Sequence, residues 1–263
     1  MKTRFFVFLL FSFCLLAMSA VEPSLSLHAE KSAGTSIRPS RPVHPPVTVY
    51  SLIDSPTAEV LDYGSFAFTT RFFSNGGLLS SMNFGVFQRL MLGISMELDS
   101  YLGSGTVDLQ RPEVNFKFRF YDGRGKFPAS AIGFNSQGYR YNKATKRYLE
   151  KEKGLYLAFT RELFARGLEM TSGANIHDFE SDALSAFVSA SYSITRAFGV
   201  FAEYDNIRSK RFNRLNAGGS VYLSPFVQMG FHARDILATK THKGTSMKRK
   251  PERIIDIRYI SSF

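Results

Sequence analysis

Hydrophobic and polar side chains alternate with a period of two from residue 64 to the end of the chain. The pattern is clear between Arg111 and Phe120, where Phe116 and Phe118 alternate with Lys117 and Arg119. Because alternate side chains of a β-strand point to opposite faces, such a strand has one apolar face and one charged face. The pattern therefore predicts strands that lie between an apolar and a polar environment.

About twelve apolar rows of this kind follow one another. None includes a charged residue, and each belongs to a segment of roughly 8–11 residues, long enough to cross a bilayer as a tilted strand. The predicted fold class is all-β: a transmembrane antiparallel up-and-down β-barrel of about twelve strands, with ten or fourteen as alternatives. The rows lie within Phe66–Phe72, Met82–Val86, Leu92–Leu98, Val114–Phe120, Ile132–Phe134, Leu155–Phe159, Leu168–Ile176, Leu184–Ile194, Phe198–Tyr204, Leu215–Leu223, Val227–Phe231 and Ile255–Phe263.

A soluble β-sandwich also alternates, but two further features favour the membrane barrel. Small residues such as Gly93, Ser95 and Gly133 recur on the polar rows, where they suit a crowded barrel interior. The expected connections also alternate in length, as periplasmic turns and outer loops do in outer-membrane barrels. Short connections are expected near residues 88–90, 121–127, 162–167, 195–197 and 224–226, and long ones near 74–80, 99–110, 137–153, 177–183, 207–213 and 236–252.

The N-terminus has the layout of a secretory signal peptide, with an uncleaved anchor as the alternative. A cationic start precedes an apolar run from Phe5 to Leu16 and small residues up to Ala20. Residues 21–60 hold six of the ten prolines, which favour extended, unpaired backbone. We therefore expect a signal peptide over residues 1–20, a Pro- and Ser-rich periplasmic linker over 21–60 and an outer-membrane β-barrel over 61–263.

The last strand alternates up to a terminal aromatic residue, through Ile255, Ile257, Tyr259 and Phe263. This ending resembles the C-terminal signal by which the bacterial assembly machinery recognises outer-membrane barrels. We therefore expect Tyr259 and Phe263 to act as an assembly signal, with the barrel assembly machinery as a partner. The expected location is the outer membrane of a Gram-negative envelope.

Two stretches carry a family resemblance, namely residues 57–90 and the segment EYDNIR from Glu203 to Arg208. They resemble an uncharacterised group of bacterial outer-membrane barrels, similar to the YjbH-like barrels linked with exopolysaccharide export. The resemblance covers most of the chain after residue 57 and brings no catalytic residue with it. It implies an accessory role in surface polysaccharide export, with export components as partners.

Charged side chains on the polar rows are expected to point into the barrel. Six are acids and six are bases, and equal numbers predict mutual pairing, because charges removed from water need partners. An open ion-selective channel would more naturally show an excess of one sign. We therefore expect a narrow or closed lumen, with a passive diffusion porin or a structural envelope barrel as alternatives. The twelve residues are Arg71, Glu97, Glu113, Lys117, Arg119, Glu169, Glu203, Asp205, Arg214, Arg234, Asp256 and Arg258.

Composition narrows the function further. The net charge is +11, and basic residues gather in the expected loops near 140–153 and 240–250. In an exported protein these loops suit lipopolysaccharide phosphates or an acidic polysaccharide better than nucleic acid, and simple solvated charge is the alternative. The single cysteine, Cys14, excludes a Cys-rich metal site, and neither His177 nor His232 has a serine partner in a recognisable motif. We expect no enzymatic activity, no cofactor and no metal.

Overall fold

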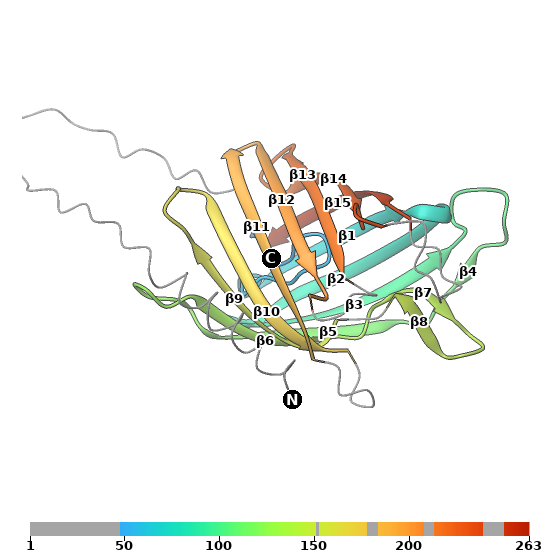
Figure 1. Ribbon diagram of the computed structural model, residues 1–263, viewed down its shortest axis with the longest axis horizontal. Coiled ribbons are helices and arrows are strands. Elements are labelled where there is room, and N and C mark those ends of the chain that lie inside the picture. Colours follow the sequence, from blue (N-terminus) through green and yellow to red (C-terminus); the bar gives the residue numbers. More distant parts are fainter. Residues whose placement is uncertain (1–47, 151–152, 178–183, 208–212, 239–249, 263) are drawn as a thin grey trace, which may run out of the picture.

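The computed structural model describes residues 48–150, 153–177, 184–207, 213–238 and 250–262. These residues form a closed antiparallel β-barrel of twelve strands (Figure 1). The barrel strands are β1 (Ser65–Phe73), β2 (Gly77–Phe87), β3 (Leu90–Asp99), β5 (Glu113–Tyr121), β6 (Ala129–Asn135), β9 (Gly154–Glu162), β10 (Leu168–Ile176), β11 (Leu184–Thr195), β12 (Phe198–Asp205), β13 (Arg214–Tyr222), β14 (Val227–Arg234) and β15 (Glu252–Ser262).

Each barrel strand pairs with the next one along the chain, and β15 pairs back onto β1. Closure removes the free edges that an open sheet would expose. Three short strands lie outside the ring: β4 (Asp108–Leu109) adds to β3, while β7 (Tyr139–Asn142) and β8 (Arg147–Glu150) form a separate hairpin. The up-and-down barrel and its twelve strands, predicted from the alternation, are thus confirmed.

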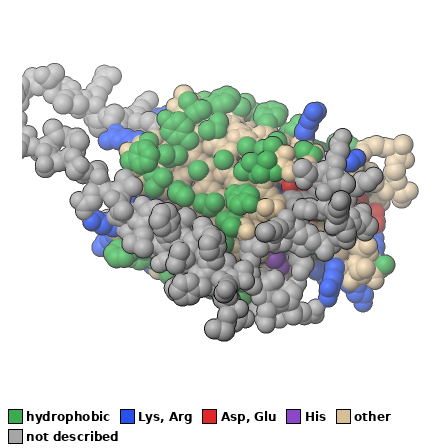
Figure 2. Space-filling view, in the orientation of Figure 1, with side chains coloured by type: hydrophobic (Ala, Val, Ile, Leu, Met, Phe, Trp, Pro, Cys, Tyr) green, Lys and Arg blue, Asp and Glu red, His purple; other side chains and the backbone are tan. Residues whose placement is uncertain are grey.

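The two faces of each strand are also as predicted. On β5, Phe116 and Phe118 are 37% and 43% exposed, whereas Lys117 between them is only 2% exposed. Apolar side chains cover much of the outer face of the strands (Figure 2). A hydrocarbon environment requires an apolar exterior, and it offers no water to hydrogen bond with the backbone. A closed barrel with apolar outer side chains meets both conditions, because its strands hydrogen bond to one another around the whole ring. The barrel therefore spans a membrane.

One end of the barrel carries the short turns, and we call it the periplasmic end. Strand β1 begins and β15 finishes at this end, since Ser65 is paired with Ser262. Highly exposed phenylalanines lie in or beside the turns there, as in the aromatic girdle that marks a membrane interface. They are Phe87, Phe127, Phe164 and Phe226, which are 66%, 70%, 75% and 53% exposed. Among the described residues, no helix is long and apolar enough to cross a membrane.

Two expected connections differ from the sequence prediction. Residues 74–80 were expected to form a long loop, but β1 and β2 are joined by the short 3₁₀ turn Ser74–Gly76. Asn75 and Gly76 adopt positive φ angles of 65° and 72°, which permit a tight reversal. In the long connection 137–153, part of the chain forms the β7–β8 hairpin.

Candidate functional site

Residues 48–62 precede β1, and we call them the lumen segment; most of them lie inside the barrel, while Asp62 at the end is exposed (Figure 1, blue). The segment is a tight hairpin in which the Leu52 backbone N–H donates to the Ser55 carbonyl at 3.0 Å. Both residues are buried, with Leu52 3% and Ser55 0% exposed. Residues 48–60, assigned to a periplasmic linker by the sequence analysis, thus belong to the barrel interior. Residues 1–47, including the expected signal peptide, lie outside the described residues.

The arms of this hairpin run toward the periplasmic end. The Ala58 backbone N–H donates to the Thr160 hydroxyl oxygen at 2.8 Å, two residues before the end of β9. Further along, the segment passes close against β2, where a Cβ added at Gly85 would lie 2.0 Å from the carbonyl oxygen of Asp62. Glycine is therefore needed at this position for the segment to reach β1.

The tip of the lumen segment is bound by the carboxylate of Glu203 on β12. The backbone N–H groups of Ile53, Asp54 and Ser55 donate to it at 2.7, 2.9 and 3.1 Å. The amide of Asn216 on β13 donates to the same carboxylate at 3.1 Å. Glu203 is 1% exposed, so its carboxyl oxygens are satisfied by the hairpin tip and Asn216 rather than by water.

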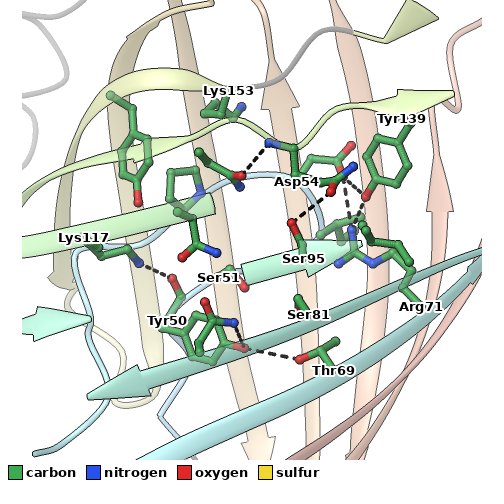
Figure 3. Close-up of a pocket in the computed structure, with 18 of the residues that line it drawn as sticks. Tyr50, Ser51, Asp54, Thr69, Arg71, Ser81, Ser95, Lys117, Tyr139 and Lys153 are labelled. Carbon is green, nitrogen blue, oxygen red and sulfur yellow. Dashed lines mark hydrogen bonds and ion pairs between the residues drawn. The ribbon is translucent and has the colours of Figure 1, made fainter. Parts of the chain in front are cut away.

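The carboxylate of Asp54 points into a second cluster of donors, drawn from the wall and from the outer hairpin (Figure 3). It lies 3.4 Å from Arg71 Nη1, 3.6 Å from Arg234 Nη1 and 3.2 Å from the Tyr139 hydroxyl. Burial by itself would raise the pKa of Asp54, but Arg234 and Arg71 outweigh it and hold the pKa below its ordinary value. The cluster therefore favours an ionised carboxylate.

Three bases of the wall bind the arms of the lumen segment. The Lys117 ammonium donates to the carbonyls of Tyr50 and Glu59 at 2.5 and 3.0 Å. Arg119 pairs with the Glu59 carboxylate at 2.7 Å. The guanidinium of Arg258 lies over the Tyr50 ring, 4.6 Å from its centroid. Together with Glu203 and Arg71, these bases fasten the segment from strands on several sides of the barrel.

The β7–β8 hairpin folds over the lumen from the opposite, outer end. Four inward residues that the sequence analysis identified bind it, and each contact uses a polar group of the hairpin. This arrangement gives charged residues of the outer half their partners. The contacts are Arg214–Glu150 at 3.2 Å, Arg234–Glu150 at 2.9 Å, the Arg140 backbone N–H to Glu97 at 2.8 Å and the Tyr148 hydroxyl to Glu113 at 2.9 Å.

Some inward charges pair with charged side chains that lie outside both the lumen segment and the β7–β8 hairpin. Arg71 and Asp256 form an ion pair across neighbouring strands at 3.7 Å, and Asp205 pairs with Lys153 at 2.7 Å. Glu169 is partly exposed on β10. The twelve charges were expected to pair with one another, but most bind the lumen segment or the outer hairpin instead. That expectation was wrong for most of them, because neither insert had been placed in the lumen.

Of the two expected assembly residues, Tyr259 lies near the end of β15. Tyr259 faces outward and is 41% exposed, in line with the apolar row of that strand. Phe263 lies outside the described residues.

Several residues of the site were missed by the sequence analysis. Asp54 and Glu59 were assigned to a linker, and Glu150 and Lys153 to a surface loop. A usable signal was present in the run VYSLIDSPTAEVL over residues 49–61, which is much more apolar than the proline-rich stretch before it. Such a run is unexpected in a solvated linker, because segments that stay in water are usually poor in apolar side chains.

A cavity of about 170 Å³ remains between the lumen segment and the wall (Figure 3). Part of its lining is a row of neutral amides, Asn83 on β2, Asn115 on β5 and Asn135 on β6. The register places Gly93 between Asn83 and Asn115, and a Cβ at Gly93 would lie 2.1 Å from Asn83 Oδ1. Glycine thus leaves room for the amides to lie against the wall, where they offer hydrogen bonds to a polar solute.

The buried histidine shows no sign of a nucleophilic site. His232 lies 2.9 Å from Asp256, and in the described part of the chain no hydroxyl hydrogen bonds to its ring. Within the same residues, no group of three or more His, Cys, Asp or Glu is arranged to hold a metal ion.

Comparisons with known proteins find similar architectures only among solved structures. The KdgM porin is 10% identical over 76% of this chain and 99% of its own, with a TM-score of 0.49. The NanC porin is 8% identical over 75% and 99%, with a TM-score of 0.41. An outer membrane channel from Pseudomonas putida F1 is 11% identical over 81% and 100%, with a TM-score of 0.44. Likenesses at this level carry no argument about what passes through the barrel.

No family model matches the chain, so the resemblance to YjbH-like barrels finds no support there. No curated protein matches it either. The conclusion rests on the chain's own features, namely a closed ring of twelve strands, an apolar exterior, short turns with exposed phenylalanines and a polar interior. The chain is an outer-membrane β-barrel protein.

Proposed function

We propose that this protein is a porin-like channel for small polar solutes, and that the lumen segment, residues 48–62, restricts passage through it. One observation carries the proposal: a hairpin of the chain's own N-terminal region lies buried in the lumen, where its tip donates three backbone hydrogen bonds to Glu203. The lumen is therefore narrowed by a separate segment of the chain rather than by packed strand side chains alone.

The chemistry of the wall supports a polar solute. Many inward residues carry hydroxyls, amides or paired charges, and the amides of Asn83, Asn115 and Asn135 line part of the remaining cavity. Removing the lumen segment would join this cavity to the space that the segment fills. The enlarged space would be lined by polar groups, as a diffusion channel requires, and the β7–β8 hairpin would still cover its outer end.

The cavity size opposes passage of a polymer in the form observed. A cavity of about 170 Å³ is close to the roughly 150 Å³ that holds one benzene-sized molecule. It can hold a small solute but not a polysaccharide chain. A porin-like role is therefore favoured over an accessory role in exopolysaccharide export, which rests on the sequence resemblance alone.

Current through single channels in planar bilayers tests this proposal. The first variant carries Ala58→Cys with Thr160→Cys, because the Ala58 nitrogen lies 2.8 Å from the Thr160 hydroxyl and a disulfide there would fasten the segment to β9. The oxidised form should pass very little current, and reduction should raise the current to the wild-type level. Each single cysteine variant is the control, since it changes the side chain without making the link.

A second variant lacks residues 49–61 and keeps all twelve strands. It should conduct steadily and pass uncharged sugars in a vesicle-swelling assay. If neither the deletion nor reduction of the disulfide raises the current, the lumen segment does not control passage and a structural envelope barrel replaces the channel. Large steady currents from the oxidised double-cysteine protein would instead favour an open diffusion porin.

A further inference from the structure

The donors around Asp54 form a site that does not depend on the lumen segment. Arg71 lies on β1, Arg234 on β14, Asn216 on β13 and Tyr139 on the outer hairpin, so only the carboxylate comes from the segment. Each arginine is also held by another partner: Arg71 by Asp256 at 3.7 Å, and Arg234 by Glu252 through Nε at 3.0 Å. The donors would therefore keep their positions if Asp54 left.

Asp54 satisfies these donors incompletely. Its oxygens lie 3.2 to 3.6 Å from the Tyr139 hydroxyl, Arg71, Asn216 and Arg234. Charge-assisted hydrogen bonds are usually about 2.7–2.9 Å long. Arg234 is 1% exposed, yet its Nη1, which faces Asp54, makes no hydrogen bond. A carboxylate free of the hairpin backbone could approach this nitrogen more closely than Asp54 does.

The site is also next to free space. Asp54, Arg71 and Tyr139 line the cavity of about 170 Å³, so a small molecule in the cavity would meet two of the four donors, Arg71 and Tyr139, directly (Figure 3). The lowered pKa of Asp54 agrees with this geometry, because it indicates a local potential that favours a negative carboxylate.

We propose that Arg71, Arg234, Asn216 and Tyr139 form a binding site for the carboxylate group of a small solute, which Asp54 occupies in the closed channel. A solute carboxylate that takes the place of Asp54 removes one set of contacts that hold the hairpin tip, so the lumen segment undocks more often. The solute thereby opens its own path. This inference rests on the proposed function for its effect on current, but the binding site itself can be tested separately.

A free carboxylate competes with Asp54 for the donor site, and this competition sets the carboxylate concentration at which the segment should be displaced. Asp54 is tethered beside its site, and a short tether gives an effective concentration on the order of millimolar. A free carboxylate of similar intrinsic affinity must therefore reach millimolar levels to displace it. Acetate is a suitable probe, and acetamide is the matched neutral control, because it has nearly the same shape without the charge.

Labelling of a cysteine at Ser55 reports displacement directly. Ser55 is adjacent to Asp54 and 0% exposed, so Ser55→Cys should react slowly with a small water-soluble thiol reagent while the segment is docked. The full chain would be used with Cys14→Ser to remove the other thiol. Acetate at millimolar concentrations should raise the labelling rate several-fold over chloride at equal ionic strength, whereas acetamide should not.

Two substitutions on the lumen segment sharpen the test. Asp54→Asn removes the charge that the site holds, so labelling at position 55 should become about tenfold faster and no longer respond to acetate. Asp62→Asn makes the same chemical change at an exposed position of the segment and should behave as wild type. Equal labelling rates in acetate, acetamide and chloride, or an unchanged rate in Asp54→Asn, would overturn the proposal.

The current measurement separates this inference from the proposed function. If the disulfide between positions 58 and 160 closes the channel but acetate changes neither labelling nor current, the segment is a gate and the carboxylate site is rejected. If acetate accelerates labelling but the segment has no effect on current, the site is supported and the channel proposal fails.

Discussion

Weakening the contact between Glu203 and the hairpin tip should release the lumen segment from the barrel wall. Glu203→Gln keeps the side-chain shape but replaces one carboxylate oxygen with an NH₂ group that can only donate. In the wild type, Oε1 accepts from Ile53 and Ser55, and Oε2 accepts from Asp54 and Asn216. Glutamine can satisfy one of these pairs, while its NH₂ group faces the donors of the other.

The size of the effect follows from these contacts. Hydrogen bonds to a charged group contribute about 1.5–3 kcal/mol each and neutral ones about 0.5–1.5 kcal/mol, so replacing the three charged bonds from the hairpin tip with at most two neutral ones costs about 3 kcal/mol or more. Removing the charge also relieves repulsion from Asp54, which offsets about 1 kcal/mol. The remainder of about 2 kcal/mol raises the undocked population of the lumen segment roughly 30-fold.

Single-channel recording and labelling of Ser55→Cys both measure this population. In Glu203→Gln the open fraction and the labelling rate should rise together, by roughly 30-fold from a mostly closed wild type. Glu162→Gln is the matched control, because Glu162 is an exposed acid at the periplasmic end of β9 that accepts the Gly167 backbone N–H at 2.7 Å, away from the segment. If Glu203→Gln matches this control in both assays, the three backbone hydrogen bonds do not hold the segment in place.

Four further predictions test the membrane register, the passage of the segment, its pH dependence and assembly. Phe116→Arg should destabilise the barrel by about 2–4 kcal/mol if the site is near the bilayer midplane, as measured by urea unfolding in lipid vesicles, and an unchanged midpoint would mean that β5 does not face lipid. Gly85→Val should clash with the carbonyl of Asp62 and raise single-channel current, whereas wild-type currents would show that the segment can take another route. The pKa of Asp54 is lowered on docking, so its contribution is complete above the ordinary aspartate value of about 3.9 and is lost as pH falls through the lowered value. The Asp54 contribution should therefore be constant from pH 7 to about 4 and currents should rise below that, whereas currents that do not rise below pH 4 would contradict the role of Asp54. A change already near neutral pH would instead be assigned to the Glu203 carboxyl, which contacts the same hairpin tip. Deleting Phe263 should reduce the amount of protein recovered in outer membranes, and normal recovery would show that the terminal aromatic is not needed for assembly.

The barrel wall could be predicted from the sequence because its determinants are local. Each strand alternates within itself, so the outward position of Phe116 and the inward position of Lys117 follow from their neighbours alone. Turn positions follow in the same way from the ends of each alternating run. The prediction failed at residues 74–80, where two residues with positive φ close a tight turn that hydrophobic alternation does not reveal.

The contents of the lumen could not be predicted in this way. Inward charges were identified as a set, but equal numbers of acids and bases do not say which groups meet. Asp54 and Glu203 are 149 residues apart, and Ser51 and Arg258 are 207 apart. Only closure of the barrel brings such groups together, because it surrounds one short segment with strands from the whole length of the chain.

The sequence by itself thus determined the strands, their two faces and the membrane that those faces require, since a period of two fixes orientation residue by residue. The tertiary structure alone decided that residues 48–62 fill the lumen and that Asp54 lies among donors from β1, β13, β14 and the outer hairpin. The physical reason is that a buried charge takes its partner from whatever the fold places within a few ångströms, and that distance is independent of separation along the chain.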